Sequence, residues 1–214
     1  VATVQEEVES ALGIVAGASV RIICAGRTDT GVHGFGQIIH FDAPVQRSPK
    51  AWCIGANRYL PAGVRLHWVT PVGAEFHARF SAVSRRYRYI ILTTPIRPAL
   101  IEGLVCWSRQ ALNLEPMNVA ASALLGEQDF SAFRAAGCQS ATAIREVKHC
   151  VVERMGDYVV IDITANAFLH HMVRNIAGSL LAVGSGRCSA DWFVQTLHGR
   201  DRKVAAETAP AAGL

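Results

Sequence analysis

The stretch Cys24–Gly36 holds the densest group of chemically useful residues in the chain. It contains Arg27 and Asp29, which lie on the same side of the backbone if the segment is extended. A guanidinium beside a carboxylate favours the ionised form, so Asp29 is a candidate nucleophile or base that stays charged at neutral pH. The alternative is an ordinary turn aspartate that accepts a hydrogen bond from a loop amide. The stretch lacks the lysine of a Walker A motif and reverses the glycine spacing of GxGxxG, so it does not match a nucleotide-binding loop.

A second candidate segment, residues 84–92, interleaves arginine and tyrosine. On a strand, Tyr87 and the other odd-numbered residues face one way, whereas Arg86 and Arg88 face the other way. Tyrosine rings stack on unpaired bases and guanidiniums neutralise phosphates, so this pattern suits single-stranded RNA. A charged, solvated strand edge with half-buried tyrosines is the alternative, and it accounts for the residues equally well.

The third candidate segment, residues 168–183, has the periodicity of an amphipathic helix. One face is apolar and carries Met172, Val173, Ile176, Leu180 and Val183. The other face carries Arg174 above Gly178, and a glycine there lets another backbone or a ligand approach the arginine closely. The adjacent His170 and His171 would point about 100° apart on a helix, which disfavours a shared metal ion. We assign the histidines no catalytic role.

Alternating short helices and strands must position these residues. Helices are predicted at residues 3–16, 49–60, 116–125, 168–183 and 190–198. The first begins with Thr3 and Glu6, which form a capping box. Strands are predicted at residues 20–24, 37–41, 64–72, 87–92, 144–153 and 158–165. Hairpin-like strand pairs occur in both halves, which favours antiparallel α+β sheets over a doubly wound parallel sheet.

The segment 94–103, with two prolines, is the predicted boundary between two lobes. The N-terminal lobe, residues 1–94, carries the loop with Asp29, and the C-terminal lobe, residues 104–214, carries the helix with Arg174.

The composition is that of a globular chain, since half of the 214 residues are hydrophobic and 18% are charged. Arginine supplies 18 of the 21 basic residues, and residues 21–110 carry twelve bases against four acids. This concentration indicates a localised face for a polyanion, although codon bias alone also enriches arginine. The six cysteines are too widely spaced for a disulfide framework or a zinc finger. No apolar run approaches the roughly 20 residues of a membrane span, so we expect a cytoplasmic protein without a membrane partner.

Taken together, these segments resemble the tRNA pseudouridine synthase A family. The matching residues lie in the family's order through most of the chain, at 26–33, 37, 40–41, 76–80, 86–89, 126, 129–131, 133–134 and 166–178. The resemblance implies a cofactor-free and metal-free isomerase that converts uridines at positions 38 to 40, in the anticodon stem-loop of tRNA, to pseudouridine. It also implies two ferredoxin-like (RNP-like) lobes with antiparallel mixed sheets, an active-site cleft between the lobes, and a homodimer whose basic surface receives tRNA.

The resemblance also assigns roles to individual residues. Asp29 is the nucleophile, and Arg174 pairs with this catalytic carboxylate. Tyr87 packs against the target base, and Arg27 helps to displace and hold the flipped nucleotide. These roles suit the chemistry, because breaking the bond between C1′ and N1 needs a charged carboxylate at the sugar and a flipped base needs an aromatic wall. Direct attack on C1′ and removal of a sugar proton to give a glycal both stay open.

Two departures separate the chain from the family pattern. Thr30 stands where many members have alanine, which is a small change. Relatives begin with a strand ahead of the helix that starts here at Thr3 and end with a strand beyond Leu214, so we expect the terminal strands to be missing. Two other functions stay open: a catalytically incomplete RNA-binding fragment of such an enzyme, and a metal-dependent phosphodiester hydrolase that uses Asp29 and the histidines.

Overall fold

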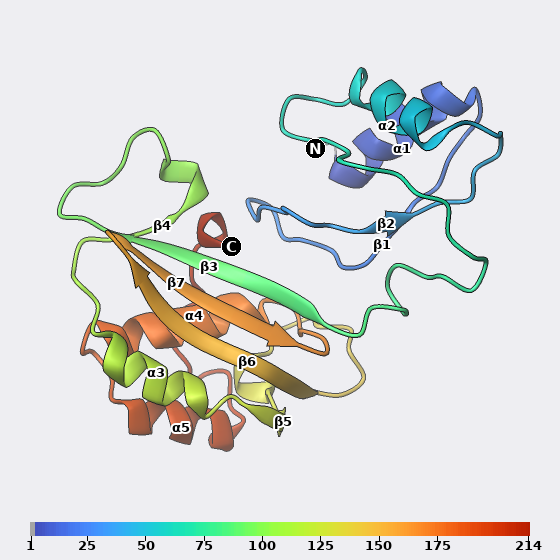
Figure 1. The fold of residues 1–214 in the computed structure, drawn as a ribbon. Coiled ribbons are helices and arrows are strands. Elements are labelled where there is room, and N and C mark those ends of the chain that lie inside the picture. The colour runs from blue at the N-terminus through green and yellow to red at the C-terminus, as the bar shows by residue number, and fades with distance from the viewer. Residues whose placement is uncertain (1–2) are drawn as a thin grey trace. The chain divides into compact units, whose positions relative to one another are not determined.

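The computed structural model describes residues 3–214, which form two compact units (Figure 1). Within the described residues, unit 1 comprises 3–27 and 35–82, and unit 2 comprises 28–34 and 83–214. The loop with Asp29 therefore belongs to unit 2, although the residues on both sides of it belong to unit 1. The predicted α+β class is confirmed, since five α-helices accompany two separate sheets in the described residues.

Unit 1 combines two helices with a short antiparallel strand pair. The helices are α1 (Val4–Ala16) and α2 (Pro49–Asn57), and the strands are β1 (Ile23–Cys24) and β2 (Ile39–His40). The predicted capping box of α1 is confirmed, because Thr3 Oγ1 accepts a hydrogen bond from Glu6 N and the Glu6 carboxylate accepts one from Thr3 N. The core of this unit includes Val8, Leu12, Ile22, Trp52, Ala56 and Leu60.

The strand predicted at 64–72 is wrong, since no strand forms in this segment. The partly buried Val64 and Leu66 alternate with exposed residues, which gives the sequence a strand-like pattern. The backbone of Leu66 bonds instead to the side chain of Asn57 on α2. Its amide donates to Oδ1 at 2.9 Å and its carbonyl accepts from Nδ2 at 2.7 Å. A side-chain amide thus satisfies the backbone groups that a partner strand would otherwise satisfy.

Unit 2 is built on a five-stranded sheet with the order β4-β3-β7-β6-β5. The strands are β3 (Arg85–Thr93), β4 (Cys106–Ser108), β5 (Gly126–Asp129), β6 (Ile144–Met155) and β7 (Tyr158–Ala165). Neighbouring strands are antiparallel except for β3 and β4. Because β3 pairs with β7 from Arg85 to Leu92, the long continuous part of unit 2 begins at Val83, ahead of the segment 94–103.

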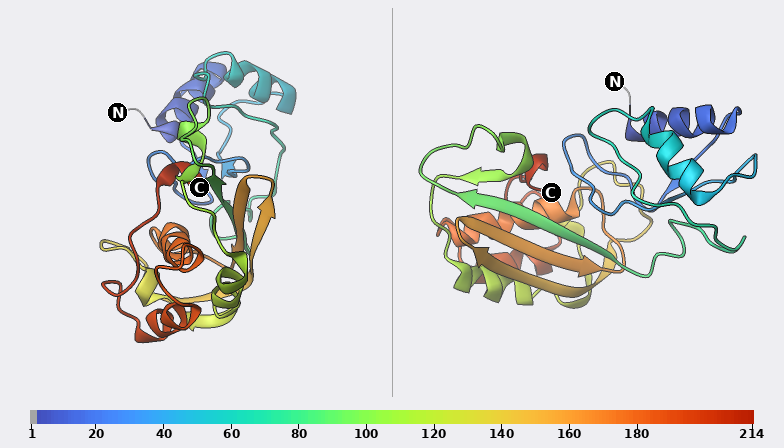
Figure 2. Two further views of the ribbon diagram at one scale, coloured as in Figure 1. Left: turned by 90° about the vertical axis from the view of Figure 1, so that its left-hand side faces the viewer. Right: turned by 45° about the horizontal axis from the view of Figure 1, so that its top comes forward.

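The helices of unit 2 are α3 (Leu114–Ser122), α4 (Met172–Gly184) and α5 (Ala190–Gly199). α3 and α4 pack against the sheet and against each other, and α5 packs on both. α4 lies behind the sheet in Figure 1, where the other face of β3, β7 and β6 turns toward the viewer, and Figure 2 shows this layer from the side. The predicted core face of α4 is confirmed, since Met172, Val173, Ile176, Leu180 and Val183 are all buried. Within residues 3–214, every helix is too short or too polar to cross a membrane.

Asp162 lies on the sheet face opposite these helices, where its buried carboxylate pairs with two arginines whose own side chains are largely exposed. Its side chain is 8% exposed and accepts hydrogen bonds from Arg86 Nε at 2.8 Å, Arg86 Nη2 at 2.5 Å and Arg88 Nε at 2.9 Å. These bonds, with Arg86 contributing most, hold the pKa of Asp162 below its ordinary value. Arg86 and Arg88 therefore pair with a carboxylate on one face of the sheet, whereas Tyr87 lies on the other face.

We expect Asp162→Asn to lower the midpoint of thermal unfolding at pH 7, because Arg86 and Arg88 would then face a neutral amide. A carboxyl whose folded pKa is lowered stabilises the fold above its unfolded pKa, about 3.9 for aspartate, and loses this effect as the pH falls through the folded pKa. The gap between wild type and variant should therefore narrow as the pH falls below about 4. Circular dichroism melts of both proteins at pH 7 and pH 3 measure the difference between their unfolding midpoints at each pH. Equal midpoints at pH 7 would contradict the expectation.

Candidate active site

Asp29 lies at the centre of a cluster of basic side chains from the start of α4. Arg174 Nη1 donates a hydrogen bond to Asp29 Oδ2 at 2.8 Å. His171 Nε2 lies 3.2 Å from the same oxygen, and His170 Nε2 lies 3.7 Å from Oδ1. The Asp29 side chain is 26% exposed, so the carboxylate is reachable from solvent while its orientation is held by the protein.

Arg174 is held in place by the backbone of the C-terminal segment, residues 207–214. Its Nε donates to the Ala209 carbonyl at 2.9 Å, and its own carbonyl accepts from Ala209 N at 3.1 Å. This segment passes directly beside Gly178, where an added Cβ would overlap the Glu207 carbonyl oxygen. The prediction that glycine admits a second backbone next to Arg174 is confirmed. The guanidinium, 15% exposed, thus meets Asp29 from a fixed position.

Tyr87 lies on the helix-facing side of β3, in the same row as the buried Tyr89. Its ring meets Phe168 edge to face, with centroids 5.1 Å apart and planes at 86°. Burial raises the pKa of Tyr87; the positive charge of Arg85 opposes this, and the negative charge of Asp29 adds to it. The ring is therefore an uncharged aromatic surface close enough to Asp29 to be affected by its charge.

The C-terminal segment also supports the site. The sequence pattern does not predict this supporting role. The Tyr89 hydroxyl donates to the Pro210 carbonyl at 2.8 Å, and His33 N in the Asp29 loop donates to the Leu214 carbonyl at 2.8 Å. Residues 209–214 thereby connect β3, α4 and the loop. No periodicity or motif in this stretch indicates such contacts, because they are made by backbone carbonyls that any residue carries.

The predicted site residues are thus only partly brought together within one unit. Unit 2 contains Asp29 and Arg174 in direct contact, with Tyr87 near them. Arg27 is the last residue of unit 1 before the loop, and its side chain is exposed. Its expected role toward a flipped nucleotide stays a prediction.

The geometry predicted for His170 and His171 is wrong. α4 begins at Met172 instead of residue 168, and His171 is its N-cap with a left-handed backbone at φ 58°. The two rings consequently lie side by side, with centroids 3.9 Å apart, and both face Asp29. One ligand atom from each of the three residues lies within 4.8 Å of the others, close enough to share a metal ion. Arg174 opposes a cation there, because its guanidinium already occupies Oδ2.

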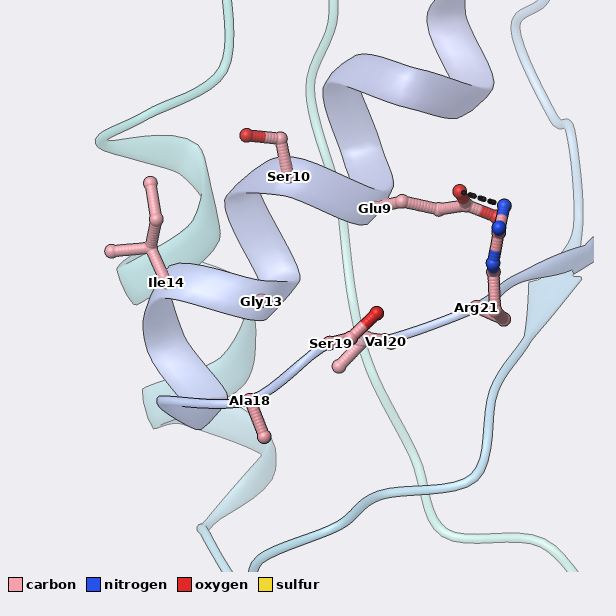
Figure 3. A pocket seen from close by; sticks show the side chains of 8 residues that line it. All are labelled: Glu9, Ser10, Gly13, Ile14, Ala18, Ser19, Val20 and Arg21. Carbon is pink, nitrogen blue, oxygen red and sulfur yellow. Dashed lines mark hydrogen bonds and ion pairs between the residues drawn. The ribbon is translucent and has the colours of Figure 1, made fainter.

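A hollow of about 400 Å³ in unit 1 is not a candidate for this chemistry (Figure 3). It lies along α1 and the segment after it, and its lining consists of Glu9, Ser10, Gly13, Ile14, Ala18, Ser19, Val20 and Arg21. The charged groups in it, Glu9 and Arg21, pair with each other at 3.3 Å. The lining contains no histidine, cysteine or aromatic ring.

Comparison with known proteins identifies the family. A family model described as tRNA pseudouridine synthase matches residues 120–214. The tRNA pseudouridine synthase A of Idiomarina loihiensis is 54% identical over 214 residues, which is 100% of this chain and 82% of that protein. The enzymes of that name from Xanthomonas oryzae pv. oryzae and Legionella pneumophila are 51% and 52% identical over 212 residues, 99% of this chain and 82% and 81% of theirs. The chain is therefore an isomerase. It belongs to the tRNA pseudouridine synthase A family.

Proposed function

We propose that this isomerase converts uridines at positions 38 to 40, in the anticodon stem-loop of tRNA, to pseudouridine, with Asp29 as the nucleophile. The observation that carries the proposal is the 2.8 Å contact between Arg174 Nη1 and Asp29 Oδ2 in a site that solvent can reach. A desolvated guanidinium stabilises a carboxylate in its charged form, which is the form that attacks. The names of the relatives support tRNA as the substrate.

The reaction needs no cofactor for its atoms to balance. The bond between C1′ and N1 breaks, the uracil turns, and a bond between C1′ and C5 forms. The C5 proton then leaves to water and N1 takes up a proton, so that the product is an isomer of uridine. Asp29 either attacks C1′ or takes a sugar proton to give a glycal, and both routes require a charged carboxylate. Tyr87 supplies an aromatic surface for the turning base, and Arg27 holds the flipped nucleotide.

We also propose that the two lobes are ferredoxin-like and that the enzyme works as a cytoplasmic homodimer. The sheet of unit 2, largely antiparallel with helices packed on one face, supports the first part. The excess of basic residues between 21 and 110 supports a tRNA-binding surface, whereas the homodimer is proposed from the resemblance to the family.

Release of tritium from tRNA that carries uridine tritiated at C5 tests this function. We expect the wild-type chain to release tritium to water at the same rate with and without EDTA and to leave the RNA length unchanged. A chain that binds tRNA with a steep salt dependence but releases no tritium would be the RNA-binding fragment. Shortened RNA, with activity that stops in EDTA, would identify the hydrolase instead.

A further inference from the structure

His171 occupies a backbone position that stability alone does not favour. Its φ of 58° and ψ of 7° are left-handed, a conformation that it shares with one other non-glycine residue, Arg200, in residues 3–214. This conformation is uncommon for residues other than glycine, although asparagine, aspartate and histidine adopt it more often than the rest. His171 is also the N-cap of α4, yet its side chain makes no capping hydrogen bond. Asparagine would suit both the backbone and the cap.

The histidine instead contacts the nucleophile. His171 Nε2 lies 3.2 Å from Asp29 Oδ2, the oxygen to which Arg174 Nη1 donates at 2.8 Å. The neighbouring His170 approaches only to 3.7 Å, which exceeds hydrogen-bond length, and its side chain is 46% exposed against 28% for His171. The left-handed backbone therefore aims one imidazole of the pair at the oxygen that Arg174 also holds.

The surroundings of the His171 ring disfavour its protonated form. Burial lowers the pKa of His171 most; the charge of Asp29 raises it, and electrostatic interactions with His170, Arg174 and Arg202 lower it. A neutral imidazole that donates from Nε2–H fixes a carboxylate without adding a second full positive charge beside Arg174. This matters because each additional cation at the carboxylate would weaken it as a nucleophile.

We propose that His171 is a positioning residue, whose Nε2 lies against Oδ2 and, with Arg174, fixes the rotation of the Asp29 carboxylate toward the bound nucleotide. The inference rests on the proposed function, in which Asp29 is the reacting group. It gives a reason for the unfavourable backbone at the start of α4, because a residue suited to capping has a side chain too short to reach Asp29.

The variant His171→Asn separates this role from a structural one. Asparagine adopts the left-handed backbone readily, so the variant should unfold at about the same temperature as wild type. Its amide does not reach Oδ2, so the single-turnover rate of tritium release should fall about 10- to 100-fold, as for a misplaced catalytic group, with unchanged tRNA affinity. His171→Gln, whose longer amide carries a donor near the position of Nε2, should recover part of the rate.

His198→Asn, which alters an exposed histidine near the end of α5, is the matched control, and it should react at close to the wild-type rate. A wild-type rate in His171→Asn would overturn the proposal. So would equal losses in the Asn and Gln variants together with a lowered unfolding temperature. Both results require an active wild type, whereas a wild type that releases no tritium would contradict the proposed function itself.

Discussion

Replacement of Asp29 by asparagine is expected to lower the single-turnover rate of tritium release at least about 10³-fold, as expected when a nucleophile is removed. An amide has nearly the size of the carboxylate but neither attacks C1′ nor accepts a sugar proton. Affinity for tRNA, measured by filter binding, should stay the same or rise slightly, because the change removes a negative charge from a surface that meets phosphates. Asp42→Asn, which alters an exposed aspartate of unit 1, is the matched control and should keep the wild-type rate.

The same substitution also leaves Arg174 without its charged partner. That guanidinium is only 15% exposed, so Asp29→Asn should unfold at a somewhat lower temperature than wild type. Rates must therefore be compared well below the unfolding midpoint, with circular dichroism showing that both proteins are folded. A folded Asp29→Asn variant with a rate near that of wild type would remove Asp29 from the mechanism.

Gly178→Ala is expected to have the second large effect, on stability and activity together. The added Cβ would overlap the Glu207 carbonyl oxygen and lie 3.3 Å from Ala209 N, and both of these are backbone atoms that cannot rotate away. The C-terminal segment must move off α4, which breaks the 2.9 Å bond from Arg174 Nε to the Ala209 carbonyl. We expect a loss of about 1–3 kcal/mol in the free energy of unfolding by urea, the usual cost of overpacking, and slower tritium release.

Gly199→Ala is the control for this substitution. Gly199 is exposed near the end of α5, and no atom lies within 4 Å of a Cβ added there. Alanine in a helix is favoured over glycine by about 0.5–1 kcal/mol, so this variant should match or exceed wild type in stability. If Gly178→Ala were as stable and as active as wild type, the C-terminal segment could not be packed against α4 as described.

The sequence predicts those parts of the fold that depend on local pattern. The capping box at Thr3 and the apolar face of α4 are contained in short stretches of residues, and both are confirmed. The segment 64–72 could not be assigned correctly, because its hydrogen bonds depend on Asn57, a residue on another element. β5 (Gly126–Asp129) was missed for a similar reason, since its four residues form a strand only through pairing with β6.

The sequence likewise predicts only part of the candidate site. The helix face with Gly178 predicts the close approach beside Arg174, whereas the pairing of Arg174 with Asp29, 145 residues away, came from the resemblance to a family and not from spacing. The position of His171 could not be predicted, because nothing in its neighbours indicates a left-handed residue or a helix that begins at Met172.

We propose above that Asp29 carries out isomerisation of uridine in the anticodon stem-loop. Mapping the positions of pseudouridine in the product RNA tests this most directly. A tRNA transcript with uridines at positions 38 to 40 is incubated with wild type or Asp29→Asn, treated with a carbodiimide that marks pseudouridine, and copied by reverse transcriptase. We predict stops at these positions with wild type and none with Asp29→Asn. Stops elsewhere only, or the same stops with both proteins, would contradict the account.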